Sequence, residues 1–316
     1  MKNINFGAYP TMITPYNENG TVDFGAVEAL TEWYWENGCD GIFAACQSSE
    51  IAFLSLADRV KLAKTVKEKA DALARSATNG RVMSIVASGH VSDDFQEQCT
   101  ELNAVAETGV DAVVLISNRS DIENTSDEKW IADTEKLLNA LPAETMVGTY
   151  ECPRPYKRLL TPKMVKWIAD TGRFAFIKDT CCDAEEIARR IEIMGDSGVK
   201  LFNANGQTTL ESLRAGAYGY CGIMCNFHPK LYVWLCHHFK DQPEMADRIG
   251  ALLSMCAFTE GPVYPVTSKY HMNLFENIPM SLYARSAHRA DLTHYQKTWI
   301  EQMHLITKEA EKALGI

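Results

Sequence analysis

The stretch Arg173-Phe-Ala-Phe-Ile-Lys-Asp-Thr-Cys-Cys-Asp183 joins a short apolar run to the beginning of a helical pattern. A run of this length and composition predicts a strand that is buried on both faces, as in parallel sheets. Lys178 closes the run. Burial disfavours the charged ammonium form of a lysine, and a neutral amine can attack a ketone to form a Schiff base. Lys178 is therefore the first candidate for chemistry.

A second proton-carrying side chain closes the preceding apolar run. Residues 145–150 predict a strand that ends at Tyr150, and a turn with Pro153 and Pro155 follows. One helix-length segment separates the two runs, so we expect Tyr150 and Lys178 at matching ends of consecutive parallel strands. A phenol in that position can move protons during Schiff-base chemistry.

The rest of the chain repeats this alternation of strand and helix. Short apolar segments predict eight strands, at residues 8–14, 41–45, 82–87, 112–116, 145–150, 174–178, 199–202 and 219–223. Amphipathic segments such as 23–37 and 55–74 begin at residues suited to cap a helix. Eight such units match an α/β protein built as a (β/α)8, or TIM, barrel. An open doubly wound sheet is the alternative, but no G-x-G-x-x-G fingerprint follows the first strand.

The pattern changes after residue 227, where the strand signal ends. Helical segments follow at residues 230–239, 243–258, 265–274 and 293–314. We therefore expect a barrel over residues 1–227 and a C-terminal helical domain over residues 228–316. Such an appendage would pack on the barrel or on a neighbouring subunit.

Composition restricts the classes of function. The chain has 316 residues and a net charge of -10, and no basic segment alternates with aromatic residues, so we expect no nucleic-acid partner. No apolar run reaches the roughly 18 residues of a membrane span, and the N-terminus shows no signal-peptide pattern. Ten cysteines in a chain without an export signal indicate reduced thiols. We expect a cytoplasmic protein.

The cysteines and histidines form no recognisable metal-binding pattern. There is no C-x-x-C pair and no H-E-x-x-H motif, and neither Cys181 with Cys182 nor Cys221 with Cys225 has the spacing of a zinc site. The sequence therefore predicts no metal and no cofactor.

A polar turn after the second predicted strand is a candidate substrate cradle. Gln47, Ser48 and Ser49 follow Cys46, at the end of the barrel where active sites lie. Paired hydroxyls and free backbone N–H groups in a tight turn can hold a carboxylate. Serine turns are also common in purely structural roles, so both interpretations stay open on the residues alone.

These motifs together resemble the dihydrodipicolinate synthase / N-acetylneuraminate lyase family of class I, Schiff-base aldolases. The resemblance covers nearly the whole chain, and its most specific points are Tyr-x-x-Pro at 150–153, Ile-Lys-Asp at 177–179 and Gly-Ile-x5-Ser-Ser-Glu at 41–50. It implies that Lys178 forms the Schiff base and that Tyr150 shuttles protons. It also implies that Ser48 and Ser49 bind the carboxylate of pyruvate or another 2-oxo acid, that Cys221 lines the pocket, and that the chain forms a homo-oligomer, a dimer or a tetramer.

Three positions depart from the synthases of that family. Gln47 stands where they have a hydroxyl that links two tyrosines in a proton relay. No tyrosine occurs near Arg119, where the neighbouring subunit is expected to lend the second one. Pro155 stands where they carry an arginine, and Arg154 precedes it. Gln47, Arg119 and Arg154 are therefore candidates to orient a second substrate.

The leading hypothesis is a lyase or aldolase that makes or breaks a carbon–carbon bond between pyruvate, or a related 2-oxo acid, and an aldehyde. A 4-hydroxy-tetrahydrodipicolinate synthase and a keto-acid hydratase or dehydratase on the same scaffold are the alternative enzymes. A keto-acid-binding protein without turnover is a further alternative, although the presence of both Lys178 and Tyr150 argues against it.

Overall fold

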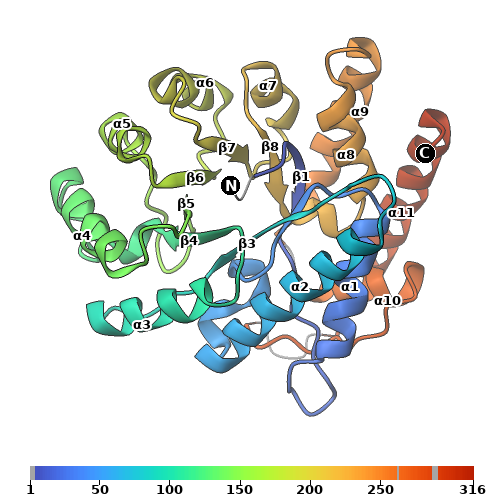
Figure 1. Ribbon diagram of the computed structural model, residues 1–316. Coiled ribbons are helices and arrows are strands. Elements are labelled where there is room, and N and C mark those ends of the chain that lie inside the picture. Colours follow the sequence, from blue (N-terminus) through green and yellow to red (C-terminus); the bar gives the residue numbers. More distant parts are fainter. Residues whose placement is uncertain (1–3, 262, 287–290) are drawn as a thin grey trace.

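Eight parallel strands form the centre of the computed structural model, which describes residues 4–261, 263–286 and 291–316 (Figure 1). They are β1 (Gly7–Pro10), β2 (Gly41–Phe43), β3 (Ser84–Ser88), β4 (Ala112–Ile116), β5 (Val147–Tyr150), β6 (Phe174–Asp179), β7 (Lys200–Asn203) and β8 (Gly219–Gly222). Their order in the sheet is β1-β8-β7-β6-β5-β4-β3-β2. A parallel bridge between Thr11 and Phe43 joins the two edges. The sheet is therefore a nearly closed (β/α)8 barrel, which confirms the predicted fold class.

Helices follow the strands and surround the barrel (Figure 1). They are α1 (Phe24–Glu36), α2 (Leu56–Ser76), α3 (Phe95–Ala106), α4 (Asp127–Ala140), α5 (Pro162–Thr171), α6 (Ala184–Met194), α7 (Thr209–Arg214) and α8 (Pro229–His238). The side chains of Asp23 and Ser55 accept hydrogen bonds from backbone N–H groups in the first turns of α1 and α2. Both helices thus begin at the capping residues that the sequence indicated.

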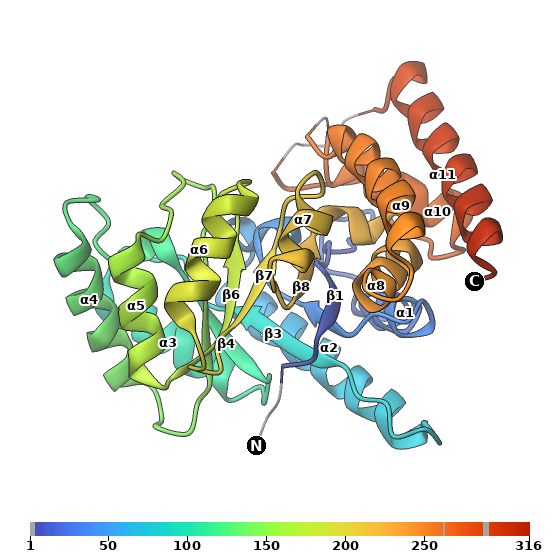
Figure 2. The ribbon, with the colours of Figure 1, turned by 90° about the horizontal axis from the view of Figure 1, so that it is seen from above.

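Three further helices lie beside the barrel: α9 (Pro243–Cys256), α10 (Val266–Phe275) and α11 (His294–Leu314) (Figure 2). Helix α8 packs against β1 and β8, whereas α11 packs against both α8 and α10. The C-terminal helices are thus continuous with the barrel through α8, and a domain division at residue 227 stays a prediction.

Aromatic side chains fill the barrel interior beneath the carboxyl ends of the strands. The rings of Tyr9 and Phe176 each lie less than 5 Å from the ring of Phe202, at 4.6 Å and 4.9 Å between centroids. These three residues are fully buried and come from three different strands. Alternate residues of a strand face the same side, so Lys178 points inward as Phe176 does, one layer nearer the carboxyl end. The barrel core therefore forms the floor of a site at that end.

Two further observations bear on the expectations from composition. All ten cysteines are free thiols. Among the helices of the described residues, none has both the length and the apolar character needed to cross a membrane. Residues 1–3, part of the N-terminus that shows no signal-peptide pattern, lie outside the described residues.

Candidate active site

Lys178 and Tyr150 lie side by side at the carboxyl ends of β6 and β5. The two residues are register partners in the parallel sheet. The Nζ atom of Lys178 lies 4.3 Å from the centroid of the Tyr150 ring and 5.5 Å from that of the Phe43 ring. Both Lys178 and Tyr150 are buried. The amine is thus held between two aromatic rings in a poorly hydrated place, which suits a nucleophilic lysine.

Three buried thiols surround this pair. Cys46 and Cys152 follow β2 and β5, and Cys221 lies on β8. Burial raises the pKa of Cys221 to about 12, and burial also raises the pKa of Cys152, while the charge of Lys178 lowers both. The thiols of Cys152 and Cys221 are therefore protonated near neutral pH and form small, weakly polar walls around the amine.

The Tyr150 hydroxyl is connected to Gln47 through Cys152. Burial raises the pKa of Tyr150 well above its ordinary value, and a side-chain hydrogen bond with Cys152 contributes in the same direction. The Sγ atom of Cys152 in turn donates to Gln47 Oε1 at 3.3 Å. The hydrogen bonds thus lead from the Tyr150 phenol through the Cys152 thiol to the Gln47 amide. Gln47 stands where the resemblance implies that the synthases have a hydroxyl.

The two serines of the predicted cradle have different surroundings. The 3-10 helix η1 (Gln47–Ser49) carries both. The Oγ atom of Ser49 lies within donor distance of two backbone oxygens, those of Met12 (2.6 Å) and Ala44 (2.9 Å). The Oγ atom of Ser48 donates to Thr11 Oγ1 at 3.0 Å. Ser49 thus fastens the turn to the barrel, whereas the Ser48 hydroxyl bonds to other hydroxyl groups, those of Thr11 and Tyr264, which can reorient.

The two arginines are not brought together. The Arg119 guanidinium pairs with Asp93 and donates to the backbone oxygen of Val91 at 3.2 Å. Arg154 is exposed on the loop after β5, and in the described part of the chain its hydrogen bonds are those of its backbone, with Asn118 Nδ2 (3.0 Å) and with Cys152. The Arg154 side chain is thus available to a ligand, whereas that of Arg119 is committed to the loop before α3.

Sequence reasoning missed Glu260, which follows the 3-10 helix η5 (Ala257–Thr259). Burial raises the pKa of Glu260 to about 7, and the charge of Lys178 and a hydrogen bond with Tyr220 partly offset this rise. Its Oε1 atom has no hydrogen-bond partner among the described residues. A carboxyl of this kind can exchange a proton near neutral pH. No local motif marks it, because only the packing of η5 against the barrel brings it close to Lys178.

A buried ion network fixes the ends of the two central strands, and the sequence did not reveal it either. Glu151 follows Tyr150, Asp179 follows Lys178, and the guanidinium of Arg190 on α6 contacts both carboxylates. Glu151 also accepts hydrogen bonds from the backbone N–H groups of Leu160 and Thr180, each at 2.7 Å. The network fixes the positions of Glu151 and Asp179, and with them the strand ends that carry Tyr150 and Lys178.

Comparisons with known proteins agree with this architecture. Residues 5–257 match the model of the dihydrodipicolinate synthetase family. The 4-hydroxy-tetrahydrodipicolinate synthase of Methanocaldococcus jannaschii is 26% identical over 276 residues, which cover 84% of this chain and 88% of that protein. The corresponding enzyme of Methanothrix thermoacetophila is 22% identical over 271 residues, which cover 84% and 86%.

Solved structures share the same fold. The structure of the 4-hydroxy-tetrahydrodipicolinate synthase from Methylacidiphilum fumariolicum SolV superimposes with a TM-score of 0.83 at 20% identity, covering 98% of both chains. The match over residues 5–257 spans every strand of the barrel and all of the residues that the sequence singled out. The chain therefore belongs to the dihydrodipicolinate synthetase family, whose members are lyases of the aldolase type.

Proposed function

We propose that Lys178 forms a Schiff base with pyruvate or a related 2-oxo acid, and that the resulting enamine makes or breaks a carbon–carbon bond to an aldehyde. The observation that carries this proposal is the position of the Lys178 amine, 4.3 Å from the centroid of the Tyr150 ring. Both residues lie at the carboxyl ends of barrel strands, where such enzymes carry out their chemistry.

The proposed reaction begins with attack of the Nζ lone pair of Lys178 on C2 of the keto acid. The carbonyl oxygen takes up a proton, and loss of water gives an iminium. The iminium withdraws electrons from C3, so a C3 proton leaves and an enamine forms. The enamine carbon then attacks the aldehyde carbon, whose oxygen takes up a proton, and water releases the product from Lys178.

We propose that Tyr150 transfers protons during the reaction. Burial keeps its phenol protonated, so it can give a proton to the departing oxygen of the keto acid and recover one later. Cys152 and Gln47 lie behind it as the next groups in line. Glu260, with its pKa near 7, is a second group that can accept a proton in this site.

For the carboxylate of the keto acid we propose Ser48, with the η1 turn that Ser49 holds in place. Cys221 forms part of the wall around the bound acid. Arg154 and Gln47 remain the candidates that orient the aldehyde, because a guanidinium recognises carboxylates and an amide recognises hydroxyls. The contacts of Arg119 with Asp93 make it a weaker candidate within its own subunit.

Borohydride trapping tests the proposal directly. With pyruvate and other 2-oxo acids, reduction should add the acid's carbon skeleton to the peptide that contains Lys178, as mass spectrometry would show. Lys178→Ala should lose both the adduct and turnover while its circular dichroism spectrum stays unchanged. Lys269 is an internal control, since it is also buried and burial lowers its pKa to about 8. An adduct on Lys269, or on the Lys178→Ala protein, would show that the nucleophile is misassigned.

We also propose that the chain forms a dimer or a tetramer and that it works in the cytoplasm. The resemblance to the family supports the assembly, and ten free thiols fit a reducing compartment. One solved structure of the same fold is described as a monomeric dihydrodipicolinate synthase variant. The fold alone therefore does not fix the oligomeric state, which has to be measured for this chain. Sedimentation velocity at micromolar concentration would distinguish the three states.

A further inference from the structure

A second cluster of titratable side chains lies in the C-terminal helices. His271 is on α10, Glu276 directly follows α10, and His304 is on α11. Each residue offers one ligand atom, an imidazole nitrogen or a carboxylate oxygen, and these atoms all lie within 4.8 Å of one another. All three residues lie beyond residues 5–257, the part of the chain that matches the family.

His271 is the residue whose surroundings need an explanation. It is 0% exposed, yet neither of its ring nitrogens has a hydrogen-bond partner within the described residues. The Nε2 atom lies 3.3 Å from Glu276 Oε1, an ion-pair distance without the angles of a hydrogen bond. Buried polar groups in folded proteins are nearly always paired. A metal ion held between Nε2 and Glu276 Oε1 would give this buried imidazole a well-directed partner in place of a poorly angled one.

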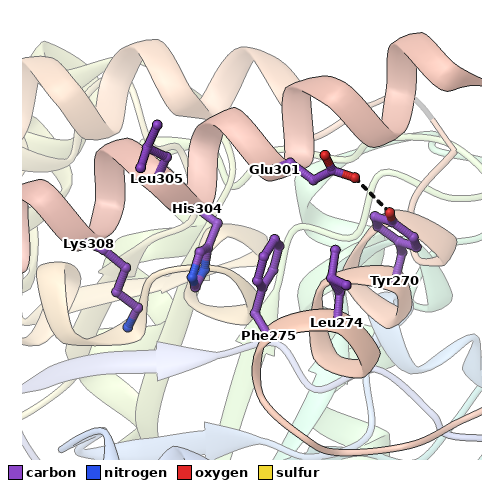
Figure 3. Close-up of a pocket in the computed structure, with 7 residues that line it drawn as sticks. All are labelled: Tyr270, Leu274, Phe275, Glu301, His304, Leu305 and Lys308. Carbon is purple, nitrogen blue, oxygen red and sulfur yellow. Dashed lines mark hydrogen bonds between the residues drawn. The ribbon is translucent and has the colours of Figure 1, made fainter.

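His304 supplies a second imidazole in a fixed orientation. Its Nδ1 atom is also buried without a hydrogen-bond partner in the described part of the chain. The ring stacks on Phe275, with 3.7 Å between centroids and 3° between planes, and its centroid lies 5.5 Å from that of His271. Figure 3 shows the stacked rings of His304 and Phe275 between α11 and α10. The stack fixes the plane in which the ring nitrogens of His304 lie.

Glu276 is held by a partner on another helix. Its Oε2 atom accepts a hydrogen bond from Trp33 Nε1 on α1 at 2.8 Å, which leaves Oε1 toward His271. Carboxylates that bind metals are commonly oriented by a second hydrogen bond of this kind. The contact also connects the cluster to the helices of the barrel.

A groove of about 570 Å³ opens beside the cluster (Figure 3). His304 forms part of its wall together with Tyr270, Glu301 and Lys308. The ammonium group of Lys308 would repel a cation, but it donates to Glu311 Oε2 at 2.8 Å, which offsets its charge. The groove offers a path for an ion and room for a water molecule as a further ligand.

We propose that His271, Glu276 and His304 bind one Zn²⁺ ion, with a fourth position taken by water from the groove. Two imidazoles and a carboxylate form a donor set that zinc uses in sites with an open position. Metal–ligand distances of about 2.0–2.2 Å place neighbouring ligand atoms roughly 3.4 Å apart, so small side-chain rotations would close the cluster. The bound ion would connect α10 to α11 and, through Trp33, to α1.

Zinc titration of the chain without a polyhistidine tag, after treatment with a chelator, tests the proposal. We expect one Zn²⁺ per chain, bound with a Kd below about 1 μM, and a higher Tm in its presence because the ion binds only the folded state. His304→Ala and Glu276→Gln should each weaken binding by at least about 100-fold, and Trp33→Phe by about 10–100-fold, the usual cost of a lost orienting contact. His294→Ala, an exposed histidine on the same helix, should have no effect.

Two results would overturn the proposal: no stoichiometric binding at micromolar Zn²⁺, or binding that His304→Ala and Glu276→Gln leave unchanged. Circular dichroism of each variant shows whether it is folded. Should either variant not fold, Co²⁺ added to the unmodified chain decides the question. Visible ligand-field bands of a four- or five-coordinate site would support the proposal, and the spectrum of hydrated Co²⁺ would refute it.

Discussion

Burial acts on the titratable side chains around Lys178 in the same direction, toward their neutral forms. It raises the pKa of Tyr150 well above its ordinary value and that of Glu260 to about 7. The phenol therefore stays protonated over the working range of most enzymes, whereas the carboxyl changes charge within it. Two groups with such different proton affinities can divide the tasks of donor and acceptor.

Tyr150→Phe removes the hydroxyl but keeps the ring that packs against Lys178 and Phe43. We expect the variant to retain the borohydride-trapped adduct with pyruvate and to lose about 10²–10⁴-fold in the rate of the chemical step, the usual contribution of a positioned acid–base group. Single-turnover kinetics would measure this loss. Turnover close to that of the unmodified chain would mean that protons travel by another route, for which Glu260 is a candidate because its pKa is about 7 and responds to the charge of Lys178.

Glu260→Gln should change how stability depends on pH. The pKa of Glu260 is about 7 in the folded chain and about 4.5 when unfolded, so the folded state binds the proton more tightly. Tighter proton binding by folded Glu260 contributes to the free energy of unfolding. This contribution is fully present below pH 4.5 and is lost as pH rises through 7, a change on the order of 3 kcal/mol. The variant should therefore match the unmodified chain near pH 4.5 and exceed it at pH 8.

Urea unfolding at both pH values provides the measurement for Glu260→Gln. The exposed Glu309→Gln serves as the control, which should follow the unmodified chain at each pH. Parallel stability curves for the unmodified chain and Glu260→Gln would show that folding does not raise the pKa of this carboxyl.

Strands β5 and β6 depend on α6 for the alignment of their carboxyl ends. Arg190 contacts the carboxylates of Glu151 and Asp179, and it also donates to the backbone oxygen of Leu160 at 2.7 Å. Since Glu151 and Asp179 directly follow Tyr150 and Lys178, a movement of α6 would be passed on to both catalytic candidates. Helix α6 thus supports the site indirectly, through the contacts of Arg190 with Glu151 and Asp179.

Arg190→Met should destabilise the fold by about 3–5 kcal/mol, because two buried carboxylates would lose the charge that compensates them. Arg189→Met is the matched control: the residue is adjacent on α6 but its side chain is 66% exposed, so its replacement should change stability by less than about 0.5 kcal/mol. Urea unfolding at pH 7 compares the two. Equal midpoints for both variants would show that the network adds nothing to stability.

At the scale of the whole molecule, the regular elements followed from local patterns. The β-branched run of β4 was predicted over residues 112–116 and is observed as Ala112–Ile116. The first strand was predicted over residues 8–14 but ends at Pro10. Thr11 still forms a single bridge to Phe43, whereas Thr14 Oγ1 bonds to the backbone oxygen of Ser49 at 2.7 Å. Boundaries thus depended on contacts with other segments.

The features that escaped prediction are those that packing alone creates. Glu260, on the segment between α9 and α10, comes within the electrostatic range of Lys178 only through packing, and His304 meets His271 only because α11 lies along α10. Spacing in the chain carries no information on which helix faces meet. The pairing of Arg119 with Asp93 was equally hidden, because it joins two loops that follow neighbouring strands. Residues at strand ends were found because parallel strands put their ends in one place.

We expect the chain to have poor activity with aspartate semialdehyde and pyruvate. The hydroxyl relay is replaced by Cys152 and Gln47. Residues 117–121 contain no tyrosine, so they offer a neighbouring subunit no phenol. Ser120 in this segment is buried, and its hydroxyl accepts a hydrogen bond from Thr134. Arg158 cannot replace the arginine missing at Pro155, because it is buried and paired with Asp121 at 2.9 Å.

A coupled assay for 4-hydroxy-tetrahydrodipicolinate synthesis, run beside a panel of hydroxylated aldehydes and sugar acids, measures this expectation. Losing a proton relay reduces the rate of the chemical step, and an unpaired substrate carboxylate costs a further 2–5 kcal/mol, roughly, if its site is buried. We expect kcat/KM below about 10⁴ M⁻¹s⁻¹ with aspartate semialdehyde. A higher value would show that Cys152, Gln47 and Pro155 do not prevent efficient synthesis. Arg154→Ala would then show whether the exposed guanidinium of Arg154 provides the missing contact, since its loss should abolish the activity.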